Sequence, residues 1–492
     1  MSFVSWQFLI LCFLTVVIYF LLGRVAKNYQ WVALLAASVV FYLFASVKLF
    51  AFLLFSGITT WAFPLAFNKC SGARKKALIA VCLFLNLGIL AFFKYAGLFN
   101  VTGLAVPLGI SFYTFQSIGY SIDVYRQMVE PEKNFFRYFL YVSFFPQISQ
   151  GPIGKYSELA PQLYASHSFD AGNLKHGLIR MLLGFFKKIV VANSLGNFVA
   201  FIYGSPENYS GVVLAFATFM YAIQLYADFS GYMDIACGFS QIIGIGLKEN
   251  FQTPYFSKSI AEYWRRWHIS LGEWFRDYLY YSVMRSALFT KVSKALRKSG
   301  HKKAAKNIPV IFGLLATWLL IGMWHGSDWS FIVHGLYHGT FVILAAVFSG
   351  FYGKCRSALK INEDAFGWKL FQVIRTFLIV CFGYVLFRAS SLPQALTIYS
   401  RIFTKNFYFG WSEGLVNRTF DKFYWICMIL SIGFLFCIEL IERRKRFADW
   451  MDERHAAVRW IIIYVMLLAI VFALMLTAGT ATNAGNFLYF DF

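Results

Sequence analysis

The sequence predicts an all-α integral membrane protein that crosses the bilayer many times. Of its 492 residues, 59% are apolar and 20% are aromatic, and the mean hydropathy is +0.59. Apolar runs close to the length of a bilayer span recur from the first residues to the last. We therefore expect roughly ten to twelve transmembrane helices and not a set of soluble domains.

Eight apolar runs are the clearest candidate spans: 3–22, 31–46, 49–67, 77–93, 308–323, 367–387, 424–441 and 460–478. No cleavage site of small residues follows the first run, so we interpret it as a retained helix. Between about 95 and 285 many glycines and several prolines interrupt the apolar pattern, among them Pro107, Pro146, Pro152 and Pro254. Irregular backbone at membrane depth needs protein or water around it, so we expect re-entrant segments around a cavity there.

Loop charge predicts the topology. Arg24 and Lys27 follow the first run, whereas the turn after the second run carries only Lys48, so the N-terminus should be external. The segment 285–306 has eight Lys and Arg residues and no acid, which indicates a cytoplasmic loop. A last span at 460–478 then returns the C-terminus to the external side. Because such loops carry much of the net charge of +22, we expect a lipid bilayer and no nucleic acid as partner.

The eight cysteines form no CxxC pair and lie mostly in apolar runs. They fit small hydrophobic residues better than disulfides or metal ligands, so we assign them no role.

The most unusual segment is "AEYWRRWHISLGEWFRDYLY" at 261–280, which mixes charged residues and a histidine with aromatic rings. Read as one helix, it would place Tyr263, Trp267 and Ser270 on one stripe, and Trp264, His268 and Leu271 on the next. The segment is compatible with an amphipathic helix at the lipid interface. It is also compatible with a functional helix, if a second polar group lies near it.

That second group is supplied by "TWLLIGMWHGSDWSFIVHGLYHGTF" at 317–341, which has three histidines in an apolar span. Ionisable residues in a span are costly and usually face a cavity or one another. His334 and His338 are four residues apart on one helical face, which fits a structural pair better than a metal pair because other ligands are absent nearby. His325 differs, because glycines and Asp328 around it should interrupt the helix.

Several motifs in order resemble the bacterial branch of the membrane-bound O-acyltransferases, which contains the alginate O-acetyltransferase membrane subunit and the membrane protein of teichoic acid D-alanylation. They are "PLGISFYTFQSIGYSIDVYR", "FFPQISQGPI", "YADFSGYMDIACG", "NFQTPYFSKSIAEYWRRWHISLGEWFRDYLY" and "GMWHGSDWSFIVHGLYHG". The resemblance covers roughly residues 1–350 well. It implies a central transmembrane tunnel in which an activated acyl group meets a hydroxyl group.

The resemblance places the family's near-invariant histidine at His325 and its second polar position at His268. Acyl transfer from a thioester needs a base for the hydroxyl proton and a donor for the oxyanion. We assign the base to His325 and the orienting or oxyanion-stabilising role to His268. Asp228 and Asp234 fit a structural role better than substrate contact. Substrate-binding residues stay unknown, and we expect no metal and no bound cofactor.

Three functions are compatible with the sequence. The first is acylation of an extracellular glycopolymer, with acetyl favoured over the D-alanyl group of teichoic acid. The donor would be acetyl-CoA or an acyl carrier protein, and an extracellular or membrane-anchored esterase-like acyltransferase would be a partner in the bacterial inner membrane. The second is a polytopic solute transporter, against which the histidine motifs and the absence of repeated halves speak. The third is a structural subunit, which would be expected to lack His325.

We expect the transmembrane domain to cover 1–484, with an external segment at about 390–423 and an external aromatic motif at 485–492. The last six residues, "FLYFDF", include one strong nucleophile candidate, the phenol of Tyr489. A similar motif ends the small partner protein of the D-alanylation system, where the family picture makes a tyrosine an acyl carrier. Tyr489 is therefore either an acyl acceptor or part of an interfacial anchor.

Overall fold

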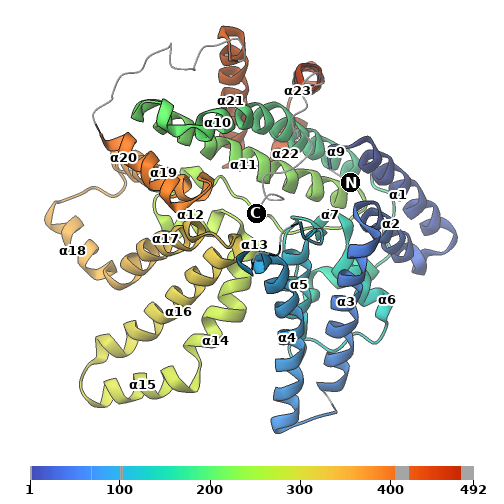
Figure 1. Cartoon of the computed structure of the whole chain (residues 1–492). Coiled ribbons are helices and arrows are strands. Elements are labelled where there is room, and N and C mark those ends of the chain that lie inside the picture. Colours follow the sequence, from blue (N-terminus) through green and yellow to red (C-terminus); the bar gives the residue numbers. More distant parts are fainter. Residues whose placement is uncertain (1–2, 68, 100, 102, 405–419, 478–492) are drawn as a thin grey trace. The chain divides into compact units, whose positions relative to one another are not determined.

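The computed structural model describes all residues except 1–2, 68, 100, 102, 405–419 and 478–492 (Figure 1). Within the described part, ten helical segments are long and apolar enough to cross a bilayer. Their helices are α1 (Trp6–Val25), α2 (Gln30–Ala45), α3 (Val47–Phe67), α4 (Gly72–Tyr95), α11 (Gly211–Ile242), α16 (Lys302–His325), α17 (Trp329–Val347), α19 (Phe366–Arg388), α21 (Lys422–Glu442) and α23 (Ala456–Thr477). The all-α polytopic fold class predicted from composition is confirmed.

Shorter helices fill the region in which the apolar pattern is interrupted. They are α5 (Ile110–Tyr125), α6 (Phe135–Ser143), α7 (Phe145–Ile148), α8 (Tyr156–Tyr164), α9 (Ala171–Phe185), α10 (Asn193–Gly204), α12 (Ile260–Arg266), α13 (Ile269–Trp274) and α14 (Tyr281–Met284). The wider turns of a π-helix continue α9 at Phe186–Ala192 and α13 at Phe275–Tyr280. The remaining helices are α15 (Ala287–Lys298), α18 (Ser349–Ala358), α20 (Leu392–Phe403) and α22 (Phe447–Asp452). The expected re-entrant course and the central tunnel stay predictions.

The chain divides into two compact units, and the division falls inside α11 between Ala227 and Asp228. Among the described residues, the first unit comprises those up to 190, 228–249 and 445–477. The second comprises 191–227 and 250–444. Each unit is described on its own.

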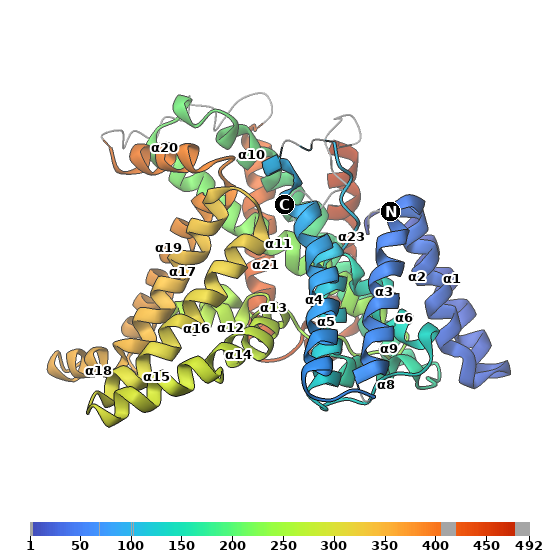
Figure 2. The same cartoon turned by 60° about the horizontal axis from the view of Figure 1, so that its bottom comes forward.

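In the first unit, α3, α4 and α5 pack side by side, as both views show (Figures 1 and 2). Elsewhere in this unit, α9 meets the second half of α11 backbone to backbone through glycines. A Cβ atom on Gly177 would lie 2.5 Å from the Gly238 carbonyl oxygen, and one on Gly184 would lie 2.6 Å from the Gly231 carbonyl oxygen. Only glycine permits this approach, so the four glycines fix how these two segments pack.

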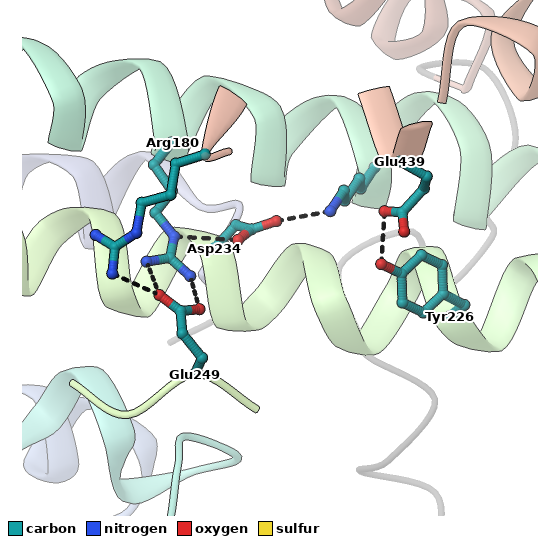
Figure 3. Close-up of polar contacts among 7 residues, drawn as sticks. Arg180, Tyr226, Asp234, Glu249 and Glu439 are labelled. Atoms are coloured by element: carbon teal, nitrogen blue, oxygen red, sulfur yellow. Dashed lines mark hydrogen bonds and ion pairs between the residues drawn. The ribbon is translucent and has the colours of Figure 1, made fainter. Parts of the chain in front are cut away.

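A buried ion-pair network lies along the same α9–α11 contact (Figure 3). The guanidinium of Arg180 donates to Asp234 at 3.1 Å and to Glu249 at 2.8 Å. In the π-helical turn, Lys187 pairs with Asp234 at 2.9 Å and Lys188 pairs with Asp228 at 2.6 Å. Removing one partner of such a pair would leave an uncompensated buried charge, so these groups hold the packing of the unit. This arrangement agrees with the structural role expected for Asp228 and Asp234.

The second unit contains an antiparallel hairpin of α16 and α17, against which α19 packs (Figure 2). The hairpin is tight because glycines face each other. A Cβ atom on Gly335 would lie 2.4 Å from the Trp318 carbonyl oxygen and 3.0 Å from Cα of Gly322. This close contact fixes the register of α17 against α16, and with it the positions of the histidines that the two helices carry.

Candidate active site

His325 is the last residue of α16, where the helix stops as the sequence predicts. Gly326 follows in a fully extended conformation, and Asp328 caps α17 by accepting a hydrogen bond from the Ser330 amide at 2.7 Å. The imidazole is buried, with 5% of the residue exposed. Its ring centroid lies 4.7 Å from that of Trp324 and 4.9 Å from that of Phe387. The histidine therefore sits in an aromatic environment at the turn of the hairpin.

His268 lies in a sharp turn and not within a continuous helix. A capping serine, Ser259, starts α12 by accepting from the Glu262 amide at 3.2 Å, and the helix ends at Arg266. Trp267 is extended, and His268 has φ of +47°, before α13 begins at Ile269. The prediction of one helix through 261–280 is therefore wrong.

Because the helix breaks at Trp267 and His268, the two helical stripes expected for Tyr263, Trp267 and Ser270 and for Trp264, His268 and Leu271 do not form. Helical spacing applies only within a continuous helix, so residues on either side of this break do not share a helical face.

One indole brings the two assigned histidines together. The ring of Trp324 contacts His268 edge to face, with centroids 5.9 Å apart, and also contacts His325. His268 is 2% exposed, and burial lowers its pKa to about 3. The imidazole of His268 is therefore neutral near pH 7, and a neutral imidazole can donate one N–H while its other nitrogen accepts.

His334 and His338 lie on one face of α17, as expected, and approach the same aromatic group. Phe387, which contacts His325, also contacts His334 at 5.1 Å between centroids, and His334 lies 4.6 Å from His338. The His334 Nδ1 atom is 2.9 Å from the Gly383 carbonyl oxygen, so Nδ1 carries the proton. Gly383 makes room for the pair, because a Cβ atom there would lie 2.6 Å from His338 Nε2. In the described part of the chain, no three potential metal ligands of the types His, Cys, Asp and Glu lie together.

Three tyrosines, of which Tyr263 and Tyr384 are buried, connect the elements around the histidines. The hydroxyl of Tyr384, next to Gly383 on α19, lies 2.6 Å from that of Tyr263 on α12 and 3.5 Å from that of Tyr255. Tyr255 in turn donates to the Ala222 carbonyl oxygen. Elsewhere in the unit, Tyr226 donates to Glu439 at 2.6 Å (Figure 3). The Tyr263–Tyr384 hydrogen bond therefore joins α12, which leads to His268, to α19, whose Gly383 carbonyl oxygen accepts a hydrogen bond from His334.

Sequence reasoning missed Trp324, Tyr384 and Phe387 as contact residues of the site. Trp324 directly precedes His325 in "GMWHG", so its position was visible, but an aromatic residue next to a histidine is common in a span. Tyr384 and Phe387 belong to an apolar run in α19 and carry no local signal. Their roles come from tertiary packing.

The basic segment 285–306 forms α15 and the first turn of α16. Lys291, Lys294 and Lys298 are exposed on α15, while Phe289 turns inward and contacts Phe312 of α16 at 5.5 Å. The helix therefore presents its charges on one side and its apolar side chains to α16. Tyr489 and the motif 485–492 lie outside the described residues.

Comparisons with known proteins all find acyltransferases. The family described as MBOAT, membrane-bound O-acyltransferase, matches residues 131–390, which include both assigned histidines. The probable alginate O-acetylase AlgI of Pseudomonas aeruginosa is 33% identical over 425 residues, covering 82% of this chain and 74% of that protein. The peptidoglycan O-acetyltransferase of Helicobacter pylori is 30% identical over 421 residues, covering 77% and 75%. The teichoic acid D-alanyltransferase of Bacillus subtilis is 30% identical over 284 residues, covering 57% and 68%.

Proposed function

Because the chain belongs to the membrane-bound O-acyltransferase family, we propose that it passes an acetyl group from a cytoplasmic thioester across the bilayer to an extracellular glycopolymer. The chain is a multi-pass membrane O-acyltransferase, and its relatives include proteins named for alginate and peptidoglycan O-acetylation and for teichoic acid D-alanylation. We place it in the bacterial inner membrane, with both termini external.

The observation that supports this proposal most is the contact of Trp324 with both His268 and His325. Two residues separated by 57 positions meet at one indole in a buried, aromatic environment. Low local polarity strengthens electrostatic interactions with a reacting group. This contact supports our assignment of one histidine as the base and the other as a neutral hydrogen-bond donor.

In the proposed reaction, His325 accepts the proton of the attacking hydroxyl group while the hydroxyl oxygen forms a bond to the thioester carbonyl carbon. His268 donates an imidazole N–H to the oxyanion that develops on the carbonyl oxygen. Collapse of the tetrahedral intermediate breaks the carbon–sulfur bond, and His325 returns the proton to the departing thiolate. The products are an O-acyl ester and a free thiol, and no net proton is consumed.

The hydroxyl that first accepts the acyl group is, in this proposal, that of Tyr489. Its aromatic neighbours would bring the tail back to the outer side of the enzyme, and an extracellular or membrane-anchored esterase-like acyltransferase would then move the acyl group from Tyr489 to the polymer. The tail has an ionisable nucleophile among apolar residues that could anchor it, which supports this assignment.

The donor is acetyl-CoA or an acyl carrier protein, and both are anionic. We propose that α15 and the start of α16 form the cytoplasmic surface on which the donor docks. Exposed lysines on one side of α15 would raise the local donor concentration and the association rate. Control of topology alone would also account for these charges, and the two explanations differ in their kinetic consequences.

Deletion of the gene that encodes the chain tests the identity of the acyl group. Ester-linked groups released by mild alkali from the envelope polysaccharides of wild-type and deletion strains are separated and identified. We expect acetate to disappear on deletion and to return with a plasmid copy. Loss of D-alanine with acetate unchanged would assign the chain to teichoic acid D-alanylation, and loss of neither would contradict the proposed function.

A further inference from the structure

Two residues with left-handed backbone conformations lie near the site, in two short segments that contact each other. Four described residues other than glycine have positive φ. Two of them, Gln127 and Lys360, directly follow helix ends, where a left-handed residue commonly closes the last turn. The other two, Thr253 (φ +42°) and His268 (φ +47°), are each the N-cap of a following helical turn, and the amide after His268 donates to Asn250 and not back into α12. Left-handed conformations are unfavourable for residues other than glycine, and a β-branched threonine is a clear outlier.

These two residues flank an antiparallel contact between 250–253 and 266–270. Phe251 and Trp267 form an isolated bridge, and the Gln252 amide donates to the Arg266 carbonyl oxygen at 3.0 Å. Strained conformations persist only where the surrounding structure determines them, and they concentrate at functional sites. We refer to this contact as the 250–270 clamp.

Asn250 holds both residues that follow His268. Its carbonyl oxygen accepts from the Ile269 amide at 3.1 Å, and its side-chain Oδ1 accepts from the Ser270 amide at 2.9 Å. Asn250 is 1% exposed, so water does not compete for these bonds. With Trp267 bridged on one side and Ile269 and Ser270 held on the other, the backbone of His268 is fixed from both directions.

We infer that Asn250 is a positioning residue that sets the direction of the His268 imidazole. In this left-handed conformation, the imidazole of His268 contacts the ring of Trp324, which also contacts His325. Loss of the clamp would let residue 268 relax to an ordinary negative φ and would carry its ring away from Trp324. This inference rests on the role proposed for His268.

The primary test is the substitution Asn250→Ala, with incorporation of labelled acetate into alkali-labile esters of the envelope polymer as the readout. Displacement of a catalytic group by about 1 Å can cost on the order of 10²-fold in rate, and we expect a loss of that size. Asn250→Asp keeps an oxygen that accepts the Ser270 amide and should restore much of the rate. Asn86→Ala is the matched control, because Asn86 is also a buried asparagine with hydrogen bonds but lies in the other unit.

A double-mutant cycle separates positioning from a general structural role. If Asn250 acts through His268, adding Asn250→Ala to His268→Ala lowers the rate no further. Independent, multiplicative losses would overturn the inference while leaving the role of His268 intact. A wild-type rate in His268→Ala would instead reject the proposed role of His268, and the inference with it.

A second readout does not depend on activity. Diethyl pyrocarbonate modifies accessible neutral imidazoles, and peptide mass spectrometry locates the modification. We expect His268 to be protected in the wild type and modified in Asn250→Ala, while His334 stays protected in both. Protection of His268 in a folded Asn250→Ala protein would contradict the positioning role.

Discussion

At His268, burial affects both the chemistry of the imidazole and the stability of the protein. The buried ring has its pKa lowered from 6.5 to about 3. A histidine in this state serves as a neutral donor and does not gain a charge at physiological pH. This property suits a group that stabilises an oxyanion and does not suit a group that must shuttle a proton. It supports the oxyanion-stabilising role that we propose for His268.

The same pKa predicts how stability depends on pH. Above pH 6.5 the ring is neutral in both the folded and unfolded states, so it makes no difference. As pH falls from 6.5 toward about 3, the unfolded ring binds a proton and the folded ring does not, so the free energy of unfolding decreases by on the order of a few kcal/mol.

Melting temperatures of the detergent-solubilised protein between pH 7 and pH 5 test this. We expect the wild-type Tm to decline toward pH 5 and the decline to be shallower in His268→Gln, which cannot titrate. Equal slopes in the two proteins would show that His268 is not buried as described.

At the level of elements, the α16–α17 hairpin determines where the histidines lie. Gly335→Ala would place a Cβ atom 2.4 Å from the Trp318 carbonyl oxygen, and the hairpin would have to separate. Overpacking of this kind costs about 1–3 kcal/mol. We expect a lower Tm and reduced acyl transfer in Gly335→Ala. Gly433→Ala, on α21 where no atom lies within 4 Å of the new Cβ, is the control and should keep the wild-type Tm.

The basic start of α16 provides a kinetic prediction. Neutralising the exposed lysines 302, 303 and 306 to glutamine should raise the apparent KM for the acyl donor several-fold at low salt and weaken its dependence on ionic strength. Initial rates in permeabilised cells with acetyl-CoA as the probe, and separately with an acetylated carrier protein, measure this effect.

The control for this experiment is the pair of substitutions Arg74→Gln and Lys76→Gln at the start of α4, which removes exposed charge from another loop that we expect to be cytoplasmic. If the lysine variant keeps both KM and salt dependence with unchanged topology, the charges of 285–306 set orientation only.

The sequence predicted best those features that depend on residues close to one another in the chain. Long apolar runs required helices, and the glycines and Asp328 around His325 predicted the break between α16 and α17 that the structure contains. The break at His268 was not predictable in this way. It depends on hydrogen bonds from Asn250 to Ile269 and Ser270, about twenty residues away, and no residue at 267–268 is a typical helix breaker. Contacts with α19 were equally hidden, because they arise only when distant helices pack.

At the scale of the whole molecule, the proposal requires an acyl group to pass from one side of the bilayer to the other. With a carrier hydroxyl on the enzyme's own tail, this would take two transfers. The first would move the acyl group from the donor to the tail, and the second from the tail to the polymer. The hydroxyl that we propose as the carrier is that of Tyr489, in the C-terminal motif 485–492.

Tyr489→Phe tests this step, because it keeps the ring and its anchoring but removes the hydroxyl group. We expect polymer acylation to be lost and an acylated C-terminal peptide, visible by mass spectrometry in the wild type, to be absent. Tyr489→Trp, which also keeps an aromatic anchor without a hydroxyl, should behave in the same way. Normal acylation in Tyr489→Phe, with no acylated C-terminal peptide in the wild type, would make the tail an anchor.

We propose that His325 is the base for acyl transfer, and the substitution His325→Ala tests this role. His325→Ala is introduced on the chromosome, and ester-linked acyl groups on the envelope polymer are measured together with the amount of protein in the membrane. His455→Ala, an exposed histidine outside the site, is the control. Since a positioned general base contributes about 10²- to 10⁴-fold, we predict that acylation falls by at least 10²-fold at normal protein level. Acylation near the wild-type rate in a normally inserted His325→Ala protein would show that His325 is not the base.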